Sequence, residues 1–355
     1  MEKILLITVR SDFGGGPRHV DQLVKLLPDK FKLYMAYPEN GVPYGIEWET
    51  NARIIDICHI PYRRLSISAL VRLIHFIKKH QIEIVHSHGN GAGLYSRLLK
   101  LFIPQIKVVH TFHGISDEYM SKFKQVTLYI IGLITEPLAD KYICVSKGER
   151  MMAFKRHFST KENTVLIYNG IKPMKTDIRK SMQHLVQIAT ITRFDYQKNT
   201  EMVIRIAKHV KDQNVKFVII GDGENRKELE ANSKREGLDI EFTGFLNNPM
   251  KRLKEIDWYI STSRFEGLPY ALIEAASMGI PIIATDVKGN NEVVVPNETG
   301  FLFNSEGDAV QLIKQIADKK IDYERMSSNS IKFFKKNFTE SKMIDNLVKV
   351  YEDLQ

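Results

Sequence analysis

The chain has few cysteines and no long hydrophobic run. Its 355 residues include two cysteines, Cys58 and Cys144, far apart and without Cys-x-x-Cys or Cys/His spacing. A disulfide framework or a zinc site of that kind is therefore not expected. The longest apolar stretch, "VTLYIIGLI", is far below the roughly 20 residues of a membrane span, and the apolar run after Glu2 is too short for a signal sequence. We expect a cytoplasmic protein.

Negative charge is scarce in the first half of the chain. Residues 1–170 contain 23 Lys and Arg against 15 Asp and Glu, a net charge of +8, whereas residues 171–355 contain 28 against 27. A basic half attracts nucleic acid, an anionic membrane surface or a phosphorylated substrate, or it is simply a basic surface. The sequence lacks the recognition module or interleaved basic and aromatic tract of a nucleic-acid-binding protein, so that alternative is the weaker one.

Short apolar runs alternate with helical patterns along the whole chain, and this alternation predicts an α/β fold. Runs such as "KILLITV" and "IEIVHSH", rich in Val and Ile, are typical of parallel strands covered on both faces. The pattern restarts at "LVQIATI" after a polar, turn-rich join at 168–184. We predict two Rossmann-like doubly wound domains, 1–170 and 171–339. The helix at about 340–355 is expected to pack back onto the first domain.

Ligands of doubly wound domains bind beyond the carboxyl ends of the strands, so two such domains predict an interdomain cleft. The first strand is followed by Gly14, Gly15 and Gly16, with Pro17 expected at the first helical position. A glycine loop at a helix N-terminus is either a phosphate contact or a simple turn. It is not the Gly-x-Gly-x-x-Gly motif, and no acidic ribose ligand follows at the right distance, so NAD binding is poorly supported.

Histidines end two predicted strands, in "HSHG" and "HTFHG". Metal ligation has no supporting His-Glu-x-x-His spacing or acidic cluster, so each histidine is either structural or a lining residue of the cleft. His113 is favoured for a functional role because Gly114 leaves it room.

Two cations, Arg193 and Lys198, directly follow the first strand of the second half in "TRFDYQKN". Cations at that position suit a diphosphate, which gains charge as a leaving group. The alternative is a solvated loop pair. The sequence "IIGDGE" ends the next strand, where a tight turn at Gly221–Gly223 is the preferred interpretation.

The stretch "RFEGLPYALIEAASMGIP" predicts a helix over 269–278, with Pro269 at its start and Gly279 after its end. Glu274 shares a narrow polar stripe with Tyr270 and Ser277 on an otherwise apolar helix. It is therefore expected to be half-buried, where it needs hydrogen-bond donors such as sugar hydroxyls. Glu266 would lie beside the same site; a structural salt bridge is the alternative for both.

These motifs in this order resemble the retaining glycosyltransferases of family 4, which have the GT-B architecture of two Rossmann-like domains. The resemblance covers essentially the whole chain, and its most specific part is "EGLPYALIEA", with Glu266 and Glu274 eight positions apart. It implies retention of configuration and transfer without a metal or other cofactor, and the absence of an Asp-x-Asp motif agrees.

The resemblance also implies a role for individual residues. Arg193 and Lys198 match the cations that bind the donor diphosphate, and Glu274 matches the ribose-binding carboxylate. Glu266 matches a group that holds the donor sugar. The other matches are Gly15 and Gly16 at the β-phosphate, His113 near the sugar, Gly267 and Leu268 at the sugar through backbone N–H groups, and Phe245 and Leu246 in the loop 242–248 that cradles the base.

The sequence therefore predicts a retaining glycosyltransferase that uses a nucleotide-diphosphate-sugar, with UDP-sugar preferred. The expected acceptor is a lipid-linked, cell-envelope or polysaccharide glycan. The segment "YRRLSISALVRLIHFIKKH" is either a membrane-contacting helix, with Leu70, Val71, Ile74 and Ile77 on its apolar face, or an ordinary crossover helix. The first possibility places the protein peripherally on the inner face of the plasma membrane. A non-hydrolysing sugar-nucleotide epimerase and a basic nucleic-acid-binding protein are the alternatives.

Overall fold

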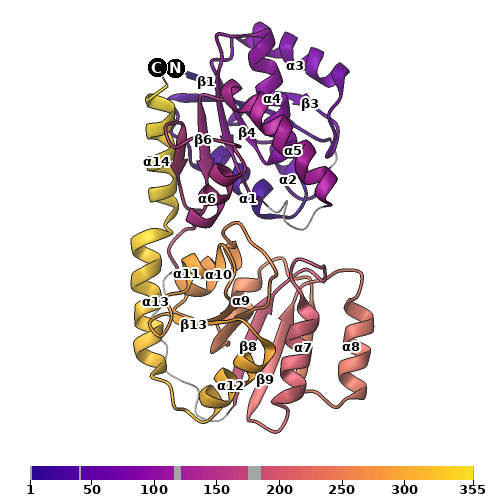
Figure 1. The fold of residues 1–355 in the computed structure, drawn as a ribbon, viewed down its shortest axis with the longest axis vertical. Helices are drawn as coiled ribbons and strands as arrows, with labels where there is room; N and C mark the ends of the chain where they lie inside the picture. The colour runs from indigo at the N-terminus through magenta and orange to yellow at the C-terminus, as the bar shows by residue number, and fades with distance from the viewer. Residues whose placement is uncertain (1, 40, 116–120, 175–184, 355) are drawn as a thin grey trace. The chain divides into compact units, whose positions relative to one another are not determined.

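The computed structural model describes residues 2–39, 41–115, 121–174 and 185–354. The chain divides into two compact units. Unit 1 comprises residues 1–169 and 341–355, and unit 2 comprises residues 170–340 (Figure 1). Part of the polar join at 168–184, residues 175–184, lies outside the described residues.

Unit 1 is built on a seven-stranded parallel sheet with the order β3-β2-β1-β4-β5-β6-β7. The strands are β1 (Glu2–Thr8), β2 (Phe31–Tyr37), β3 (Ile54–His59), β4 (Ile84–His88), β5 (Lys107–Thr111), β6 (Lys141–Cys144) and β7 (Thr164–Leu166). The helices are α1 (Gly15–Leu26), α2 (Tyr44–Glu49), α3 (Ile67–His80), α4 (Asn90–Phe102), α5 (Lys122–Thr135), the short 3-10 helix η2 (Glu136–Leu138), α6 (Lys147–Lys155) and α14 (Glu340–Glu352).

Both faces of the unit 1 sheet are covered, which explains why its strands are apolar on both sides. On β1, Leu5 and Ile7 belong to one core with residues of α3, α4 and α6. Ile4 and Leu6 belong to the opposite core, with α1 and five residues of α14. Helix α14, which follows unit 2 in the sequence, is therefore part of the core of unit 1 (Figure 1).

Unit 2 repeats this architecture with a six-stranded parallel sheet, ordered β10-β9-β8-β11-β12-β13. Its strands are β8 (Val186–Ile191), β9 (Val215–Ile220), β10 (Ile240–Gly244), β11 (Trp258–Ser261), β12 (Ile282–Thr285) and β13 (Gly300–Phe303). Its helices are α7 (Thr200–His209), α8 (Arg226–Arg235), α9 (Pro249–Leu253), α10 (Tyr270–Ser277), α11 (Asn290–Val293), α12 (Glu306–Ala317) and α13 (Tyr323–Asn337).

The two sheets share the same kind of strand order, and each confirms the predicted doubly wound α/β class. The order reverses beside β1 in unit 1 and beside β8 in unit 2. Ligands of such sheets bind at that reversal, outside the carboxyl ends of the strands. The candidate residues after β8 and β11 therefore lie where this fold places its ligands. Among the described residues, no helix is both long and apolar enough to cross a membrane.

Candidate active site

The centre of the candidate site in unit 2 is the carboxylate of Glu266, on the loop after β11. Its side chain is 7% exposed and accepts three hydrogen bonds. Lys198 Nζ lies 2.6 Å from Oε1, Ser263 Oγ lies 2.7 Å from the same oxygen, and Gln197 Nε2 lies 3.3 Å from Oε2. Both carboxylate oxygens are thus held, and the buried charge has a cation beside it. Gln197 and Ser263, which the sequence motifs did not single out, are part of the site.

Lys198 and Gln197 lie on the loop between β8 and α7. Arg193 is near the start of this loop, and its side chain is more exposed to solvent than that of Lys198. Its Nε donates to Asp195 Oδ2 at 2.9 Å, and its Nη2 donates to Gln197 Oε1 at 3.3 Å. The side chain is 46% exposed, against 21% for Lys198. The structure therefore brings Arg193 and Lys198 onto one loop that Gln197 links to Glu266. Asp195 offsets the charge of Arg193 and was not predicted as part of the site.

The loop 193–199 is tied to the loop after β11 by hydrogen bonds that involve its backbone. Arg264 N donates to Gln197 O at 2.8 Å, and Thr262 Oγ1 donates to the carbonyls of Lys198 and Asn199 at 3.1 and 3.0 Å. Such ties hold charged side chains in place before a ligand arrives, which is how preorganised electrostatic sites work.

Glu274 lies inside α10 and is buried, rather than half-buried as predicted. Tyr270 and Ser277, the other members of its polar stripe, are buried too. The phenol of Tyr259 on β11 is influenced by both carboxylates. Burial raises its pKa, and the negative charges of Glu274 and Glu266 raise it further. Both glutamates therefore act on one buried region of unit 2.

Helix α10 starts one residue later than predicted, with Pro269 as the residue that precedes it and Gly279 in a left-handed conformation after it. Gly267 and Leu268, predicted to offer backbone N–H groups, precede this helix. Gly289 packs against them from the β12–α11 loop: a Cβ at Gly289 would lie 2.4 Å from the carbonyl oxygen of Gly267. The loop of Glu266 is thus supported from β8 on one side and from β12 on the other.

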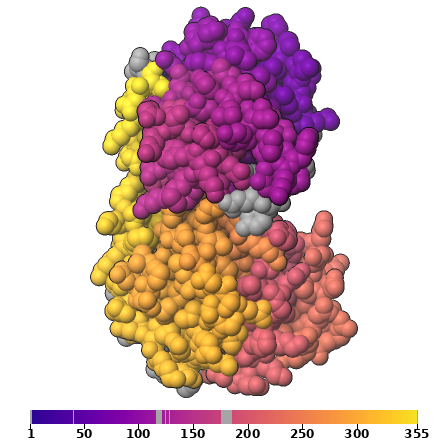
Figure 2. Space-filling model, in the orientation of Figure 1, coloured from indigo at the N-terminus to yellow at the C-terminus, as the bar shows by residue number. Residues whose placement is uncertain are grey.

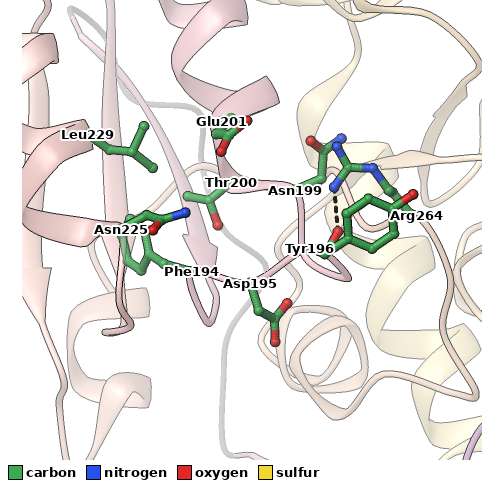
Figure 3. Close-up of a pocket in the computed structure, with 9 residues that line it drawn as sticks. All are labelled: Phe194, Asp195, Tyr196, Asn199, Thr200, Glu201, Asn225, Leu229 and Arg264. Carbon is green, nitrogen blue, oxygen red and sulfur yellow. Dashed lines mark hydrogen bonds between the residues drawn. The ribbon is translucent and has the colours of Figure 1, made fainter.

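A cavity of about 210 Å³ lies beside the same loop, between the starts of α7 and α8 (Figure 3). Its described lining comprises Phe194, Asp195, Tyr196, Asn199, Thr200, Glu201, Asn225, Leu229 and Arg264 and does not include Lys198, Glu266 or Glu274. The guanidinium of Arg264 lies 4.2 Å from the centre of the Tyr196 ring and donates to the Tyr196 carbonyl (Figure 3). Phe245, predicted to cradle the base with Leu246, is exposed just after β10.

In unit 1 the glycine loop differs from its prediction in one detail. Helix α1 begins at Gly15, so Pro17 is its third residue rather than its first. Proline is tolerated there because N–H groups of the first turn have no partner within the helix. A Cβ at Gly16 would lie 3.6 Å from the ring of His113, an ordinary contact distance, so this glycine is next to that ring.

Four histidines, His19, His86, His88 and His113, lie close together near the glycine loop. His88 Nδ1 lies 3.2 Å from His113 Nε2, and the rings of His19 and His113 meet edge to face at 5.0 Å between centroids. His86, on the same strand as His88, is held by Tyr351 OH at 2.6 Å and Thr111 Oγ1 at 2.7 Å. The structural interpretation therefore holds for His86, and His113 is the half-buried member of the group.

Burial keeps these imidazoles neutral. It lowers the pKa of His19 to about 4 and lowers the pKa of His88 and His113 well below 6.5, with neighbouring imidazoles adding to the shift for the last two. Among the described residues, His19, His88 and His113 are the group whose ligand atoms, all within 4.8 Å of one another, could hold a metal ion. The hydrogen bond between His88 and His113 already uses two of these ring nitrogens.

Glu149 is a site residue that the sequence did not reveal. It is buried on α6, and its carboxylate accepts from the backbone N–H of Gly114 at 2.6 Å and of Val145 at 2.7 Å. It therefore fixes the turn that follows His113. The sequence feature that could have revealed Glu149 is the Ser146-x-x-Glu149 spacing. This spacing is typical of a helix N-terminus and normally indicates only a helix cap.

Comparisons with known proteins agree on the family. Residues 13–175 match the model described as Glycosyltransferase Family 4, and residues 174–333 match Glycosyl transferases group 1. An Escherichia coli protein named UDP-Gal:alpha-D-GlcNAc-diphosphoundecaprenol alpha-1,3-galactosyltransferase is 26% identical over 379 residues, covering 99% of this chain and 97% of that protein. The O-antigen biosynthesis glycosyltransferase WbnH of Escherichia coli is 24% identical over 336 residues, 94% of each chain.

The fold has close counterparts among solved structures. The crystal structure of Anabaena HepE in complex with UDP superimposes with a TM-score of 0.82 at 16% identity, covering 99% of this chain and 100% of that one. This likeness confirms the predicted GT-B fold. The two family models together span residues 13–333. The chain is therefore an enzyme that belongs to the glycosyltransferases of group 1 and family 4.

Proposed function

We propose that this glycosyltransferase moves a hexose from a UDP-sugar to a lipid-linked glycan of the cell envelope, with retention of configuration and without a metal. The name of the Escherichia coli galactosyltransferase contains UDP-Gal and a diphosphoundecaprenol acceptor, and the second relative is named for O-antigen biosynthesis. HepE was crystallised with UDP. These names support the donor and the acceptor class proposed for this chain.

The observation that carries the proposal is the Lys198–Glu266 pair on the tied loops of unit 2. Breaking a glycosyl-phosphate bond leaves negative charge on the departing diphosphate, and cations fixed beforehand stabilise that charge most effectively. Lys198 is held near its position by Glu266, and Arg193 stands exposed on the same loop. In the proposed reaction Arg193 and Lys198 bind the diphosphate, and Glu266 with the backbone of Gly267 and Leu268 orients the sugar.

The remaining roles are proposed from the family resemblance. Glu274 accepts hydrogen bonds from the ribose hydroxyls, a suitable task for a buried carboxylate in an apolar helix. Phe245 and Leu246 contact the base. Gly15 and Gly16 approach the β-phosphate, and His113 contacts the sugar as a neutral imidazole, because burial lowers its pKa.

We propose that Glu266 orients the sugar and does not attack it. Hydrogen bonds and a neighbouring cation stabilise the negative charge of a carboxylate and weaken it as a nucleophile, and Oε1 of Glu266 accepts from Lys198 and Ser263 while Oε2 accepts from Gln197. This arrangement favours a front-face reaction without a covalent intermediate. Mass spectrometry of the enzyme after incubation with donor alone should show the unmodified chain. A hexose adduct on Glu266 would overturn this part of the proposal.

A donor panel tests the function directly. Thermal unfolding is measured with UDP-, GDP- and ADP-sugars, because a ligand at about 100 times its dissociation constant stabilises a protein by about 2.7 kcal/mol. We expect stabilisation by a UDP-sugar and its loss in Arg193→Ala. Arg205→Ala is the matched control, since Arg205 lies on α7 with similar exposure, 48% against 46%, and pairs with Glu306. If no sugar nucleotide stabilises the wild type, the proposed donor is wrong. If Arg193→Ala and Arg205→Ala behave alike, Arg193 is not part of the donor site.

A further inference from the structure

The helix predicted to contact a membrane, α3, does not offer its apolar face to solvent. Leu70 and Ile77 belong to the core of unit 1, and Val71 is the exposed member of the predicted face. Figure 1 shows α3 on the outside of unit 1, and purple residues of the same part of the chain form the surface there in Figure 2. The crossover-helix interpretation is therefore correct for α3, and the prediction that this face meets a membrane is wrong.

Three histidines of unit 1, His19, His88 and His113, lie together although they come from three different elements. We call them the histidine cluster. His19 lies on α1, His88 is the last residue of β4, and His113 follows β5. Strands β4 and β5 are parallel neighbours, and His88 pairs in register with Thr111 at the end of β5. The carboxyl ends of two strands thus bring two of the rings together, and one ring nitrogen of each histidine lies within 4.8 Å of the other two.

The rings of the cluster are held in place by the fold. His19 is 2% exposed and His88 is 3% exposed. Nδ1 of His19 lies 3.2 Å from Asn169 Oδ1. Because an amide oxygen only accepts hydrogen bonds, Nδ1 carries the proton of this neutral ring and Nε2 carries the lone pair. Histidines that bind metals commonly donate their other ring nitrogen to an oxygen in this way, which fixes the tautomer and the orientation of the ring.

Two members of the cluster already have the separation of two metal ligands. His88 Nδ1 lies 3.2 Å from His113 Nε2. Zinc–nitrogen distances of about 2.0–2.1 Å place two nitrogens of a tetrahedral site about 3.3–3.4 Å apart. The hydrogen bond between the two rings holds one proton, and this proton is displaced when an ion binds. The remaining adjustment is the approach of His19, whose ligand atom starts within 4.8 Å of the other two.

A neighbouring histidine shows what a structural role looks like at this place. Both ring nitrogens of His86 are held, one by Tyr351 and the other by Thr111. By contrast, Nε2 of His88 is buried and has no hydrogen-bond partner among the residues that the structure describes. Native structures pair nearly all their buried polar atoms, so an unpaired ring nitrogen is unusual for a histidine that serves packing alone.

The donor atoms of the cluster select the kind of ion. They are three imidazole nitrogens, without a carboxylate or a thiolate in the group. Mg²⁺ and Ca²⁺ take oxygen ligands, whereas imidazole suits Zn²⁺, Co²⁺, Ni²⁺ and Cu²⁺. Burial lowers the pKa of all three rings, so an ion competes with few protons at neutral pH. A site with three histidines leaves a fourth position for water or another oxygen ligand.

We propose that the histidine cluster binds Zn²⁺ or a similar transition-metal ion, which is not needed for transfer and inhibits it. A bound ion occupies the ring nitrogen of His113, the residue proposed to contact the sugar. It also lies close to Gly16, whose Cβ position is 3.6 Å from that ring. The metal site stands on the geometry of unit 1 alone, whereas the inhibition rests on the proposed function.

Titration with Co²⁺ tests the binding, because the visible absorption of this ion reports its coordination. The full-length protein, without a polyhistidine tag, is freed of metal with EDTA and dialysed into plain buffer. We expect the absorption of four-coordinate Co²⁺ at about one ion per chain, and its loss when Zn²⁺ is added. In His19→Gln and in His88→Gln the affinity should fall about tenfold or more, because changes even to residues behind the ligands have such effects.

Two other histidines provide matched controls. His110 is fully buried on β5 but does not belong to the cluster, and His209 is an exposed histidine of unit 2. His110→Gln and His209→Gln should both bind Co²⁺ as the wild type does. X-ray absorption of the Zn²⁺-loaded wild type needs no variant, and it should show imidazole nitrogens at about 2.0–2.1 Å. The site is refuted if Co²⁺ gives no such absorption, if all four variants bind it equally, or if the Zn²⁺ spectrum lacks imidazole.

Transfer assays test the inhibition. Zn²⁺ should lower the rate of the wild type, and EDTA should restore it. In His19→Gln, half-inhibition relative to the variant's own metal-free rate should need about tenfold more Zn²⁺ or a still higher concentration. Binding without inhibition would overturn the inhibitory role and with it the proposed contact of His113 with the sugar. Co²⁺ binding without stabilisation by a UDP-sugar would refute the donor site alone, and the reverse result would refute the metal site alone.

Discussion

Lys198 Nζ lies 2.6 Å from Oε1 of Glu266, and the glutamate side chain is 7% exposed. A pair this short and this buried is costly to break on one side, since the remaining charge has lost its partner in a poorly hydrated place. The pair also joins the loop after β8 to the loop after β11. Lys198 therefore both supports Glu266 and, in the proposed reaction, meets the diphosphate.

Replacing Lys198 should reduce transfer strongly. For Lys198→Met we expect the rate to fall about 100-fold to 1,000-fold, by analogy with the loss of one donor from an oxyanion hole. Lys208→Met is the control, because Lys208 on α7 pairs with Glu236 at 2.9 Å with both side chains well exposed. Steady-state transfer assays on both variants give the comparison. If the transfer rates of the two variants differ by no more than about threefold, a free-energy difference close to what independent sites show, Lys198 has no role in the mechanism.

Gly289 is predicted to be indispensable to the Glu266 loop. Its φ is +85°, and an added Cβ would lie 2.4 Å from the Gly267 carbonyl oxygen and 3.1 Å from Glu266 Cβ. Gly289→Ala should therefore displace residues 266–267. We expect kcat to fall by about tenfold or more, because small displacements of groups at a reacting centre lower the rate strongly. Gly237→Ala shares the cost of a positive φ, +65°, but its Cβ meets nothing within 4 Å. Equal activity of the two variants would contradict this role.

Glu149 is predicted to act as a positioning residue through Gly114 and His113. In Glu149→Gln one amide oxygen must replace a carboxylate that accepts two backbone N–H groups, so we expect unfolding to cost about 1–3 kcal/mol less. If His113 contacts the transferred sugar, kcat should fall while the KM for donor stays nearly constant. Glu83→Gln, which changes a carboxylate bonded to the exposed N–H of Lys3, is the control. An unchanged kcat would leave Glu149 with a structural role only.

Acid should destabilise unit 1 through its buried histidines. Burial lowers the pKa of His19 to about 4 and lowers the pKa of His86, His88, His110 and His113, so the unfolded chain binds protons first as pH falls below 6.5. Stability is then complete above that pH and is lost as pH falls towards the lowered values. For His19 the loss is about 1.4 kcal/mol per pH unit once the unfolded form is protonated.

Urea unfolding at pH 7, 6 and 5 measures this loss. The chain has two tryptophans, so Trp258→Phe leaves Trp48, buried in unit 1, as the fluorescence probe. We expect the midpoint to fall with pH, and to fall less steeply in a His110→Gln background. His209→Gln, an exposed histidine of unit 2, should leave the slope unchanged. A midpoint that does not respond to pH would show that these rings are protonated in the folded state.

Metal removal gives a simpler prediction. The family resemblance implies transfer without a metal, and Lys198 and Arg193 supply positive charge at the proposed diphosphate site. Enzyme dialysed against EDTA should therefore keep its full transfer rate. A loss that added Zn²⁺ restores would instead assign a catalytic role to the cluster of His19, His88 and His113.

The fold class and the placement of Glu274 in a helix could be predicted from the sequence, because each leaves a local pattern in it. Strands apolar on both faces and glycines and prolines around α10 determined the fold class and the position of Glu274 in a helix. Features that depend on long-range packing were not readable. Nothing local indicates that Gln197 would meet Glu266, since it lies 69 positions from it in the chain. The burial of Glu274 exceeds the prediction because a polar stripe does not show what covers it.

The two amphipathic helices show the same limit. The segment of α3 has an apolar face and basic neighbours, which fits a membrane helix and a crossover helix equally well, and only the sheet beneath it decides. In α5 the apolar run "VTLYIIGLI" is too short for a membrane span, and its sequence does not show which side faces outward. Gly132 and Gln125 are on the side that faces unit 1, and their partners Phe158 and Arg156 come after β6 in the sequence.

The position of α14 determines the order in which the protein can be completed during synthesis. Tyr351, which follows all of unit 2 in the chain, closes the core of unit 1 and holds His86. A ribosome therefore releases all of unit 2 before unit 1 receives α14. Until then α1 already packs on that face of the unit 1 sheet, but the area that α14 covers stays exposed, and a chain truncated after residue 169 would remain in that state. Appending residues 341–355 through a short linker would supply the missing cover.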